Sequence, residues 1–170
     1  MTERARVLKV GGALLGVLVA GLIAGFMLLD GDDSPPSNST PSPTSTDVRA
    51  QIEQAYLHHW DVYTEANLKL DTSRLAEVLT GDALNVVRSQ IEQQKAKNQP
   101  VRISVEHDYR ISLIDPATPT VEDNYVNHSQ RLDPQTMDPI EPDPDKSVRR
   151  TYTMKKVDGT WKVSFIVGLT

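Results

Sequence analysis

Four ring side chains have the residue types and the spacing that acid–base chemistry requires. His59 and Tyr63 recur at the interval of one helical turn, and His107 and Tyr109 at the two-residue repeat of a strand. A histidine exchanges protons near neutral pH, and a tyrosine hydroxyl stabilises a developing oxyanion. We therefore take these four residues as the candidate lining of a ligand pocket, with Asp61 and Tyr152 as further candidates.

The same four residues also suit core or rim positions in which their hydrogen bonds are satisfied, and no known catalytic motif surrounds them. Neighbouring His58 and His59 do not form a metal pair, because adjacent residues on a helix diverge by about 100 degrees. The chain contains no cysteine, which excludes thiol catalysis and thiolate metal sites. The sequence thus predicts no catalytic residue, no metal and no cofactor.

Apolar residues at spacings of three and four predict a long helix that Thr46 or Asp47 caps. Its buried stripe would contain Val48, Ile52, Ala55, Tyr56, His59, Val62, Tyr63, Ala66 and Leu70. A short second helix would carry Leu75, Val78 and Leu79, with Asp71 or Thr72 as its cap and Gly81 at its end. A third helix, capped by Asp82, would bury Leu84, Val87 (or Val86) and Ile91.

After Pro100 the apolar repeat changes to two, which predicts strands. A long, bent strand would cover residues 101–113, and a more polar one residues 121–132. Residues 148–157 and 161–167 alternate on either side of Asp158-Gly159, a strong hairpin signal. Three helices followed by four strands predict an α+β domain with a four-stranded antiparallel sheet.

The N-terminus is typical of a membrane anchor. Arg4, Arg6 and Lys9 precede an uncharged apolar segment, residues 10–29, which is long enough as a helix to span about 30 Å of hydrocarbon. Acidic residues follow the segment, so the positive-inside rule places the N-terminus in the cytoplasm. We therefore expect a cytoplasmic tail (1–9), a transmembrane helix (10–29), a disordered Pro/Ser/Thr-rich linker (30–46) and an extracytoplasmic domain (47–170).

A cleaved signal peptide is the alternative to this single-pass anchor in the cell membrane. Signal peptides have a shorter apolar region, of roughly 7–15 residues, and a small-residue cleavage site, which the residues after position 26 lack. Small residues recur every four positions in the segment, and this spacing indicates either a dimer seam or the ordinary abundance of such residues in membrane helices. The seam would be formed by Gly12, Gly16, Ala20 and Ala24.

Charge restricts the partners of the exterior domain. The chain carries a net charge of −5 and its first 29 residues +2, which leaves −7 on residues 30–170. Nucleic acids are therefore not expected as partners, because they require basic patches. The expected contacts are membrane lipid through residues 10–29 and a protein partner in the envelope.

The aromatic first helix, the step from Leu75 to Leu84 and the Val-Asp-Gly-Thr-Trp-Lys-Val hairpin at 157–163 resemble the nuclear-transport-factor-two-like superfamily. Within it, the chain is similar to membrane-tethered extracytoplasmic members and to the intermembrane-space domain of plastid division proteins. The resemblance implies helices packed on a curved sheet, a cone that contains a pocket. Some members are isomerases or cyclases, in which an Asp abstracts a proton, whereas many only bind or scaffold.

Two functions therefore remain open at this point. The leading hypothesis is a membrane-anchored, non-enzymatic protein-interaction or scaffolding module. The alternative is a small-molecule-binding or isomerase-like cone that uses a pocket near His59, Tyr63, His107 and Tyr109. A pocket filled by Trp60, Phe165 or loop side chains would favour the first hypothesis, and a deep pocket that is closed at its base and holds a buried acid would favour the second.

Overall fold

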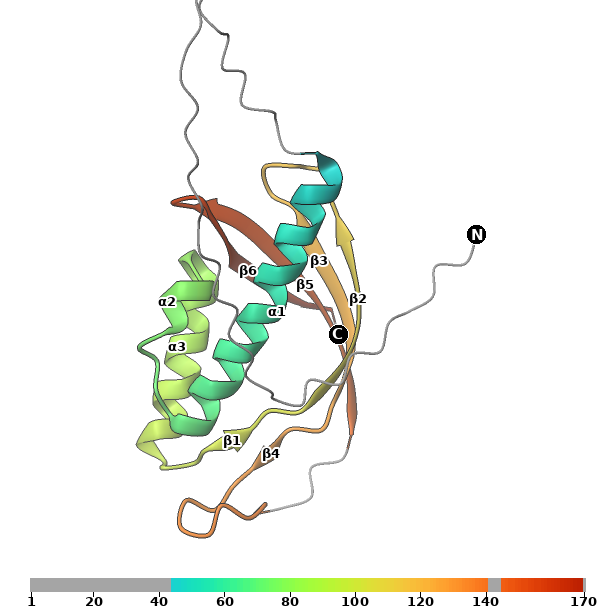
Figure 1. Ribbon diagram of the computed structural model, residues 1–170. Helices are drawn as coiled ribbons and strands as arrows, with labels where there is room; N and C mark the ends of the chain where they lie inside the picture. Colours follow the sequence, from blue (N-terminus) through green and yellow to red (C-terminus); the bar gives the residue numbers. More distant parts are fainter. Residues whose placement is uncertain (1–43, 141–144, 170) are drawn as a thin grey trace, which may run out of the picture.

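A computed structural model describes residues 44–140 and 145–169 of the chain (Figure 1). The predicted tail, the apolar segment 10–29 with its four small residues, and most of the linker lie outside this part. Within the described residues, no helix combines the length and the apolar character needed to cross a membrane.

The first helix, α1 (Ser45–Lys69), carries the predicted buried stripe but begins before the predicted caps. Thr44 is the N-cap: its hydroxyl accepts a bond from the backbone N–H of Asp47, whose carboxylate accepts one from the backbone N–H of Thr44. Thr46 and Asp47 are therefore wrong as caps, because this reciprocal capping box places Asp47 inside the helix. Leu70 adopts a left-handed conformation and ends α1.

The caps predicted for the other two helices are also wrong. Arg74 precedes α2 (Leu75–Val78), and Thr80 precedes α3 (Gly81–Ala96). Between these helices Leu79 is extended and bridges to Val163, so the chain must turn sharply from the sheet into α3. Gly81, at φ 56°, makes this turn and begins α3 instead of ending α2.

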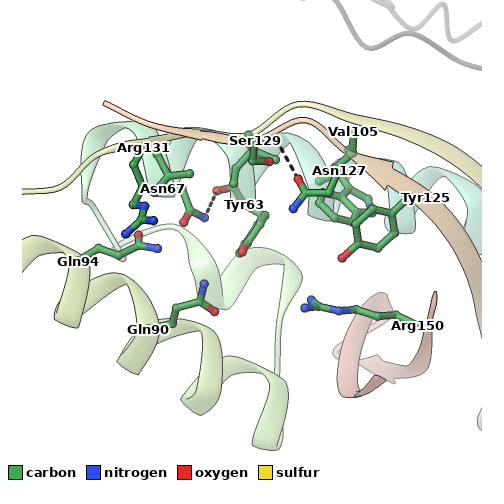
Figure 2. Close-up of a pocket in the computed structure, with 13 residues that line it drawn as sticks. Tyr63, Asn67, Gln90, Gln94, Val105, Tyr125, Asn127, Ser129, Arg131 and Arg150 are labelled. Carbon is green, nitrogen blue, oxygen red and sulfur yellow. Dashed lines mark hydrogen bonds between the residues drawn. The ribbon is translucent and has the colours of Figure 1, made fainter. Parts of the chain in front are cut away.

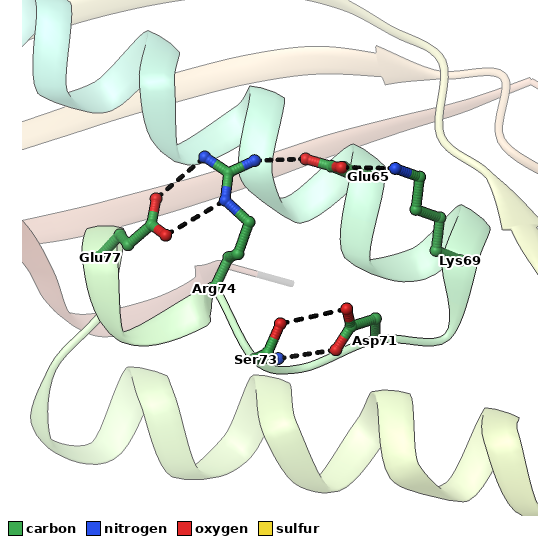
Figure 3. Close-up of polar contacts among 6 residues, drawn as sticks. All are labelled: Glu65, Lys69, Asp71, Ser73, Arg74 and Glu77. Carbon is green, nitrogen blue, oxygen red and sulfur yellow. Dashed lines mark hydrogen bonds and ion pairs between the residues drawn. The ribbon is translucent and has the colours of Figure 1, made fainter.

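An ion-pair network fastens α2 to the end of α1 (Figure 3). The Arg74 guanidinium contacts Glu65 on α1 at 2.5 Å and Glu77 on α2 at 2.9 Å, and Glu65 also pairs with Lys69. All these groups are solvent-exposed, so the network orients the connection more than it stabilises the fold.

The predicted antiparallel sheet is confirmed, with the strand order β2-β3-β5-β6. The six strands of the described residues are β1 (Val101–Arg102), β2 (Val105–Ser112), β3 (Thr120–Asn127), β4 (Gln130–Arg131), β5 (Lys146–Val157) and β6 (Thr160–Leu169). The first two predicted strands are each divided: β1 pairs with β4 in a separate ribbon. At the division, the Ser104 carbonyl accepts a hydrogen bond from the His128 backbone N–H, and the Ser104 backbone N–H donates one to Ser129 Oγ. These two bonds replace the regular ladder.

A bulge in the β5–β6 hairpin changes which alternate residues of β6 face the core. The register shifts between Thr153 and Met154, so Trp161 and Val163 face the core, whereas Phe165 lies on the outer face with 48% of its surface exposed. Phe165 therefore does not fill the pocket, whereas a pocket filled by it would have favoured the interaction module. The bulge instead places Ile166 on the inner face, where it packs against the core.

The helices lie on the concave face of the curved sheet, and the core forms between these two layers (Figure 1). Ile52 and Leu75 from the helices and Val121 and Met154 from the sheet are among its fully buried residues. Of the expected residues on α3, Val87 and Ile91 are buried, Leu84 is half-buried and Val86 is exposed. The α+β class and the three helices on a curved four-stranded sheet are thus confirmed.

Replacement of Gly159 by alanine should destabilise the domain by about 1 kcal/mol, because Gly159 has φ 81° in the hairpin turn and an L-residue is strained there. Urea unfolding of the full-length chain in detergent, followed by tryptophan fluorescence, measures the change. Gly168→Ala is the matched control: no atom lies within 4 Å of an added Cβ, and its φ is not positive, so its effect should stay below about 0.5 kcal/mol. Equal effects at both positions would contradict the turn geometry.

Candidate functional site

The interior of the cone is filled by a cluster of rings from α1 and three strands. Ring centroids of neighbouring members lie between 4.7 Å, for Trp60 and His107, and 6.5 Å, for His107 and Tyr109. The cluster consists of Tyr56, His59, Trp60, Tyr63, His107, Tyr109, Tyr125 and Tyr152. Such edge-on and offset contacts pack closely, so little open space remains at the centre.

A buried carboxylate lies beneath these rings. Asp123 Oδ2 accepts the hydroxyl of Tyr56 at 2.5 Å and lies 2.6 Å from His107 Nδ1. Asp123 and Tyr56 are fully buried, and His107 is 2% exposed. When the carboxylate accepts both bonds, the ring proton of His107 resides on Nδ1. The three groups thus form a buried hydrogen-bond network inside the cone, in which Asp123 Oδ1 and His107 Nε2 have no partner among the described residues.

Burial determines the protonation of the surrounding groups. It raises the pKa of Tyr56 well above the ordinary value, with contributions from Tyr152 and Asp123, so this hydroxyl stays protonated. Burial also lowers the pKa of His59 to about 3, and the neighbouring His107 and Arg150 add to the effect. His59 is therefore neutral at physiological pH and a weak base.

A first cavity of about 210 Å³ opens between α1, α3 and the strand ends (Figure 2). Figure 2 shows its polar side chains arranged around one space, with Arg150 at one end and Asn67, Gln94 and Arg131 at the other. Its lining consists of Trp60, Tyr63, Asn67, Gln90, Gln94, Val101, Ile103, Val105, Tyr125, Asn127, Ser129, Arg131 and Arg150.

A second cavity of about 220 Å³ lies beside the first, between α1, α3, β5 and β6. Both cavities are lined by Trp60, Tyr63, Gln90 and Arg150, which therefore stand between them. The other residues of the second cavity are His59, Val86, Val87, Tyr152, Ile166 and Gly168. Among the described residues, no group of three His, Asp or Glu side chains is arranged to hold a metal ion.

The four predicted site residues join the ring cluster, but they divide between cavity and core. Tyr63 lines both cavities and His59 the second one. His107 lies in the buried network and lines neither cavity, and the Tyr109 hydroxyl donates to Glu53 at 2.7 Å. Of the further candidates, Tyr152 lines the second cavity, whereas Asp61 is exposed. A role in ligand binding stays a prediction for each of them.

Sequence reasoning missed Asp123 and Arg150, which are central to the site. Both are polar residues on the inward face of a strand: Asp123 lies between Val121 and Tyr125 on β3, and Arg150 precedes Tyr152 by two positions on β5. The signal was present in the two-residue repeat, because an ionisable residue in phase with buried neighbours must face the interior.

The adjacent histidines His58 and His59 should differ in their effect on pH stability. His59 stays neutral in the folded state down to about pH 3, whereas an unfolded histidine titrates near ~6.5. Between these values the unfolded state binds more protons, so stability falls as the pH falls, by up to about 1.4 kcal/mol per pH unit. His59→Phe should remove this contribution to the slope, measured by urea unfolding between pH 4 and 7.

His58→Gln is the control, because His58 is solvent-exposed and its replacement should leave the slope unchanged. The same slope in the wild-type and His59→Phe proteins would show that the His59 imidazole is solvated and not buried.

Solved structures resemble the domain, although no family model and no curated protein matches the sequence. The intermembrane-space region of the chloroplast protein ARC6 aligns with a TM-score of 0.58 and 14% identity, over 72% of this chain and 96% of that one. A protein described as a scytalone dehydratase from Novosphingobium aromaticivorans aligns with a TM-score of 0.48 and 14% identity, over 74% and 89% of the two chains. At this identity a likeness extends to the fold alone. With its helices packed on a curved antiparallel sheet around an aromatic interior, the chain shares the fold of the ARC6 region, which is the nuclear-transport-factor-two-like cone that the sequence resemblance implied.

Proposed function

We propose that this chain is a membrane-tethered, non-enzymatic binding protein whose cone domain takes up a small ligand in the first cavity. The observation that carries the proposal is the position of Trp60, which packs 4.7 Å from His107 and also lines both cavities. The indole therefore separates the space open to a ligand from the buried carboxylate network. Because a general acid or base must reach its substrate, this separation favours binding over catalysis.

The distribution of apolar surface favours a small ligand over a protein partner. The exposed large apolar residues of the described part are spread over α1, α3, two loops and β6, as Leu68, Val86, Ile114, Met137, Ile140, Phe165 and Val167. Apolar residues scattered in this way are ordinary on a protein surface, whereas a stable protein interface requires a contiguous patch. The protein partner expected from the sequence stays a prediction.

Acid–base catalysis is the second candidate, and the Asp123 network supports it. A carboxylate paired with an imidazole and a phenol has the composition of a proton-transfer site. This function would require Trp60 to move aside, so that a substrate in the cavity could reach His107.

The proposal that the protein is membrane-tethered is based on the apolar segment 10–29. It predicts that the two termini lie on opposite sides of the membrane. Protease added to intact cells that produce the full-length chain should degrade a C-terminal epitope and leave an N-terminal epitope protected, because the basic residues hold the N-terminus in the cytoplasm. A membrane-impermeant label on each epitope provides an independent measurement. Recovery of the domain from the medium without residues 10–29 would instead support the cleaved signal peptide.

The binding function predicts that closure of the first cavity abolishes ligand uptake. Gln90 lies on α3 and lines both cavities, so Gln90→Trp should fill the space without disturbing the core. Ligand-observed NMR with a library of small organic acids, amides and alcohols should detect binders of the full-length chain in lipid nanodiscs, and these should be lost in this variant.

Gln93→Trp is the matched control, because Gln93 lies on the same helix, is exposed and lines neither cavity. Absence of any binder, or equal binding by Gln90→Trp, would contradict the proposal. Chemical conversion of a binder by the wild-type chain, lost in Asp123→Asn, would establish the second candidate instead.

A further inference from the structure

We propose that the ligand of the first cavity is a small organic carboxylate, which the Arg150 guanidinium binds. This inference rests on the proposed binding function and adds the chemical class of the ligand. Three observations support it: the charge of the lining, the absence of an ion pair at Arg150, and the aromatic walls and free Asn67 acceptor of the cavity.

The lining of the first cavity is basic within an acidic domain. Arg131 and Arg150 are its charged residues, and no Asp or Glu is among the thirteen that line it. The domain as a whole, residues 47–170, in contrast carries a net charge of −4. A cavity that concentrates positive charge in this way attracts anions from a surrounding surface that repels them.

Arg150 is half-buried and forms no ion pair with any described carboxylate. Burial alone would lower its pKa, but the hydroxyls of the surrounding tyrosines outweigh this effect and raise the pKa, so the guanidinium is charged. Buried charges in proteins are normally paired, because desolvation is costly. Figure 2 shows the Arg150 guanidinium directed into the cavity, between Gln90 and Tyr125, where an anion would complete the pair.

The planar guanidinium suits a carboxylate, which accepts two parallel N–H bonds from it. The space next to Arg150 is walled by Trp60, Tyr63 and Tyr125, and aromatic rings favour a flat organic body over a hydrated inorganic ion.

At the other end, Asn67 is fully buried. Its Nδ2 donates to the Tyr63 carbonyl at 2.8 Å, and its Oδ1 has no partner. This bond fixes the orientation of the amide, so the free oxygen offers an acceptor to a ligand hydroxyl or amine. A flat acid with a donor at its far end therefore matches both ends of the cavity.

The test compares 4-hydroxybenzoate with its neutral analogue 4-hydroxybenzamide, by ligand-observed NMR titration of the full-length chain in nanodiscs of zwitterionic lipid. The acid should bind at least about tenfold more tightly than the amide, because a charge-assisted bidentate bond contributes more than a neutral one. Arg150→Gln should weaken binding of the acid at least about tenfold and leave the amide unchanged. Benzoate, which lacks the hydroxyl, should bind more weakly than 4-hydroxybenzoate.

Arg149→Gln is the matched control, because it removes the same charge from the next residue, which is exposed and lines neither cavity. Equal binding of acid and amide by the wild-type chain, or equal losses in the two arginine variants, would overturn the carboxylate assignment while the binding function stands. Inorganic phosphate that displaces 4-hydroxybenzoate at equal concentration would also overturn it. If Gln90→Trp binds the acid as well as the wild type does, both the assignment and the proposed function fail.

Discussion

The hydrogen bonds of the buried Asp123 carboxylate are the interaction on which the rest of the domain depends. A carboxylate without access to water requires hydrogen bonds, and it obtains them from Tyr56 on α1 and His107 on β2. The network therefore joins the helix layer to the sheet at one point. Removal of one hydrogen-bond partner from such a buried group typically costs about 1–3 kcal/mol, a considerable share of the stability of a domain of this size. The helix cannot rotate about its axis without breaking this contact.

The orientation of α1 about its axis in turn determines which of its residues line the first cavity. Tyr63 and Asn67 follow Tyr56 by seven and eleven residues, about two and three helical turns, so all three share the inward face. On the sheet side, the division between β1 and β2 carries the β1–β4 ribbon out of the four-stranded sheet and supplies Val101 and Arg131. The first cavity thus results from the divided strands next to a core that the Asp123 network holds in place. Unpaired polar groups such as Asn67 Oδ1 are a cost to stability that proteins accept at functional sites.

Periodicity was sufficient to predict the elements but not their ends or interruptions. The stripe on α1 and the Asp158-Gly159 hairpin are strong local signals, and both are present in the structure. The bulge at Met154, which turns Phe165 outward, depends on how two strands fit against the core and leaves no mark in the alternation. Asp123 and Arg150 lie in phase with buried residues, yet a polar residue in a weakly marked strand is easily assigned to solvent. The role of Asp123 depends on Tyr56, which is 67 residues away in the sequence, and the role of Arg150 depends on a cavity that forms only in the folded chain.

The position of the cavity relative to the tether bears on the source of the ligand. The chain enters the domain at Thr44, whereas the acceptor end of the first cavity is at Asn67, near the far end of α1. At about 1.5 Å per residue these two points are roughly 35 Å apart along the helix. Under the proposed anchoring through residues 10–29, a ligand dissolved in the bilayer would have to leave it to enter this cavity, whereas a charged, water-soluble acid would meet the cavity directly. The geometry and the charge of Arg150 therefore favour the same class of ligand.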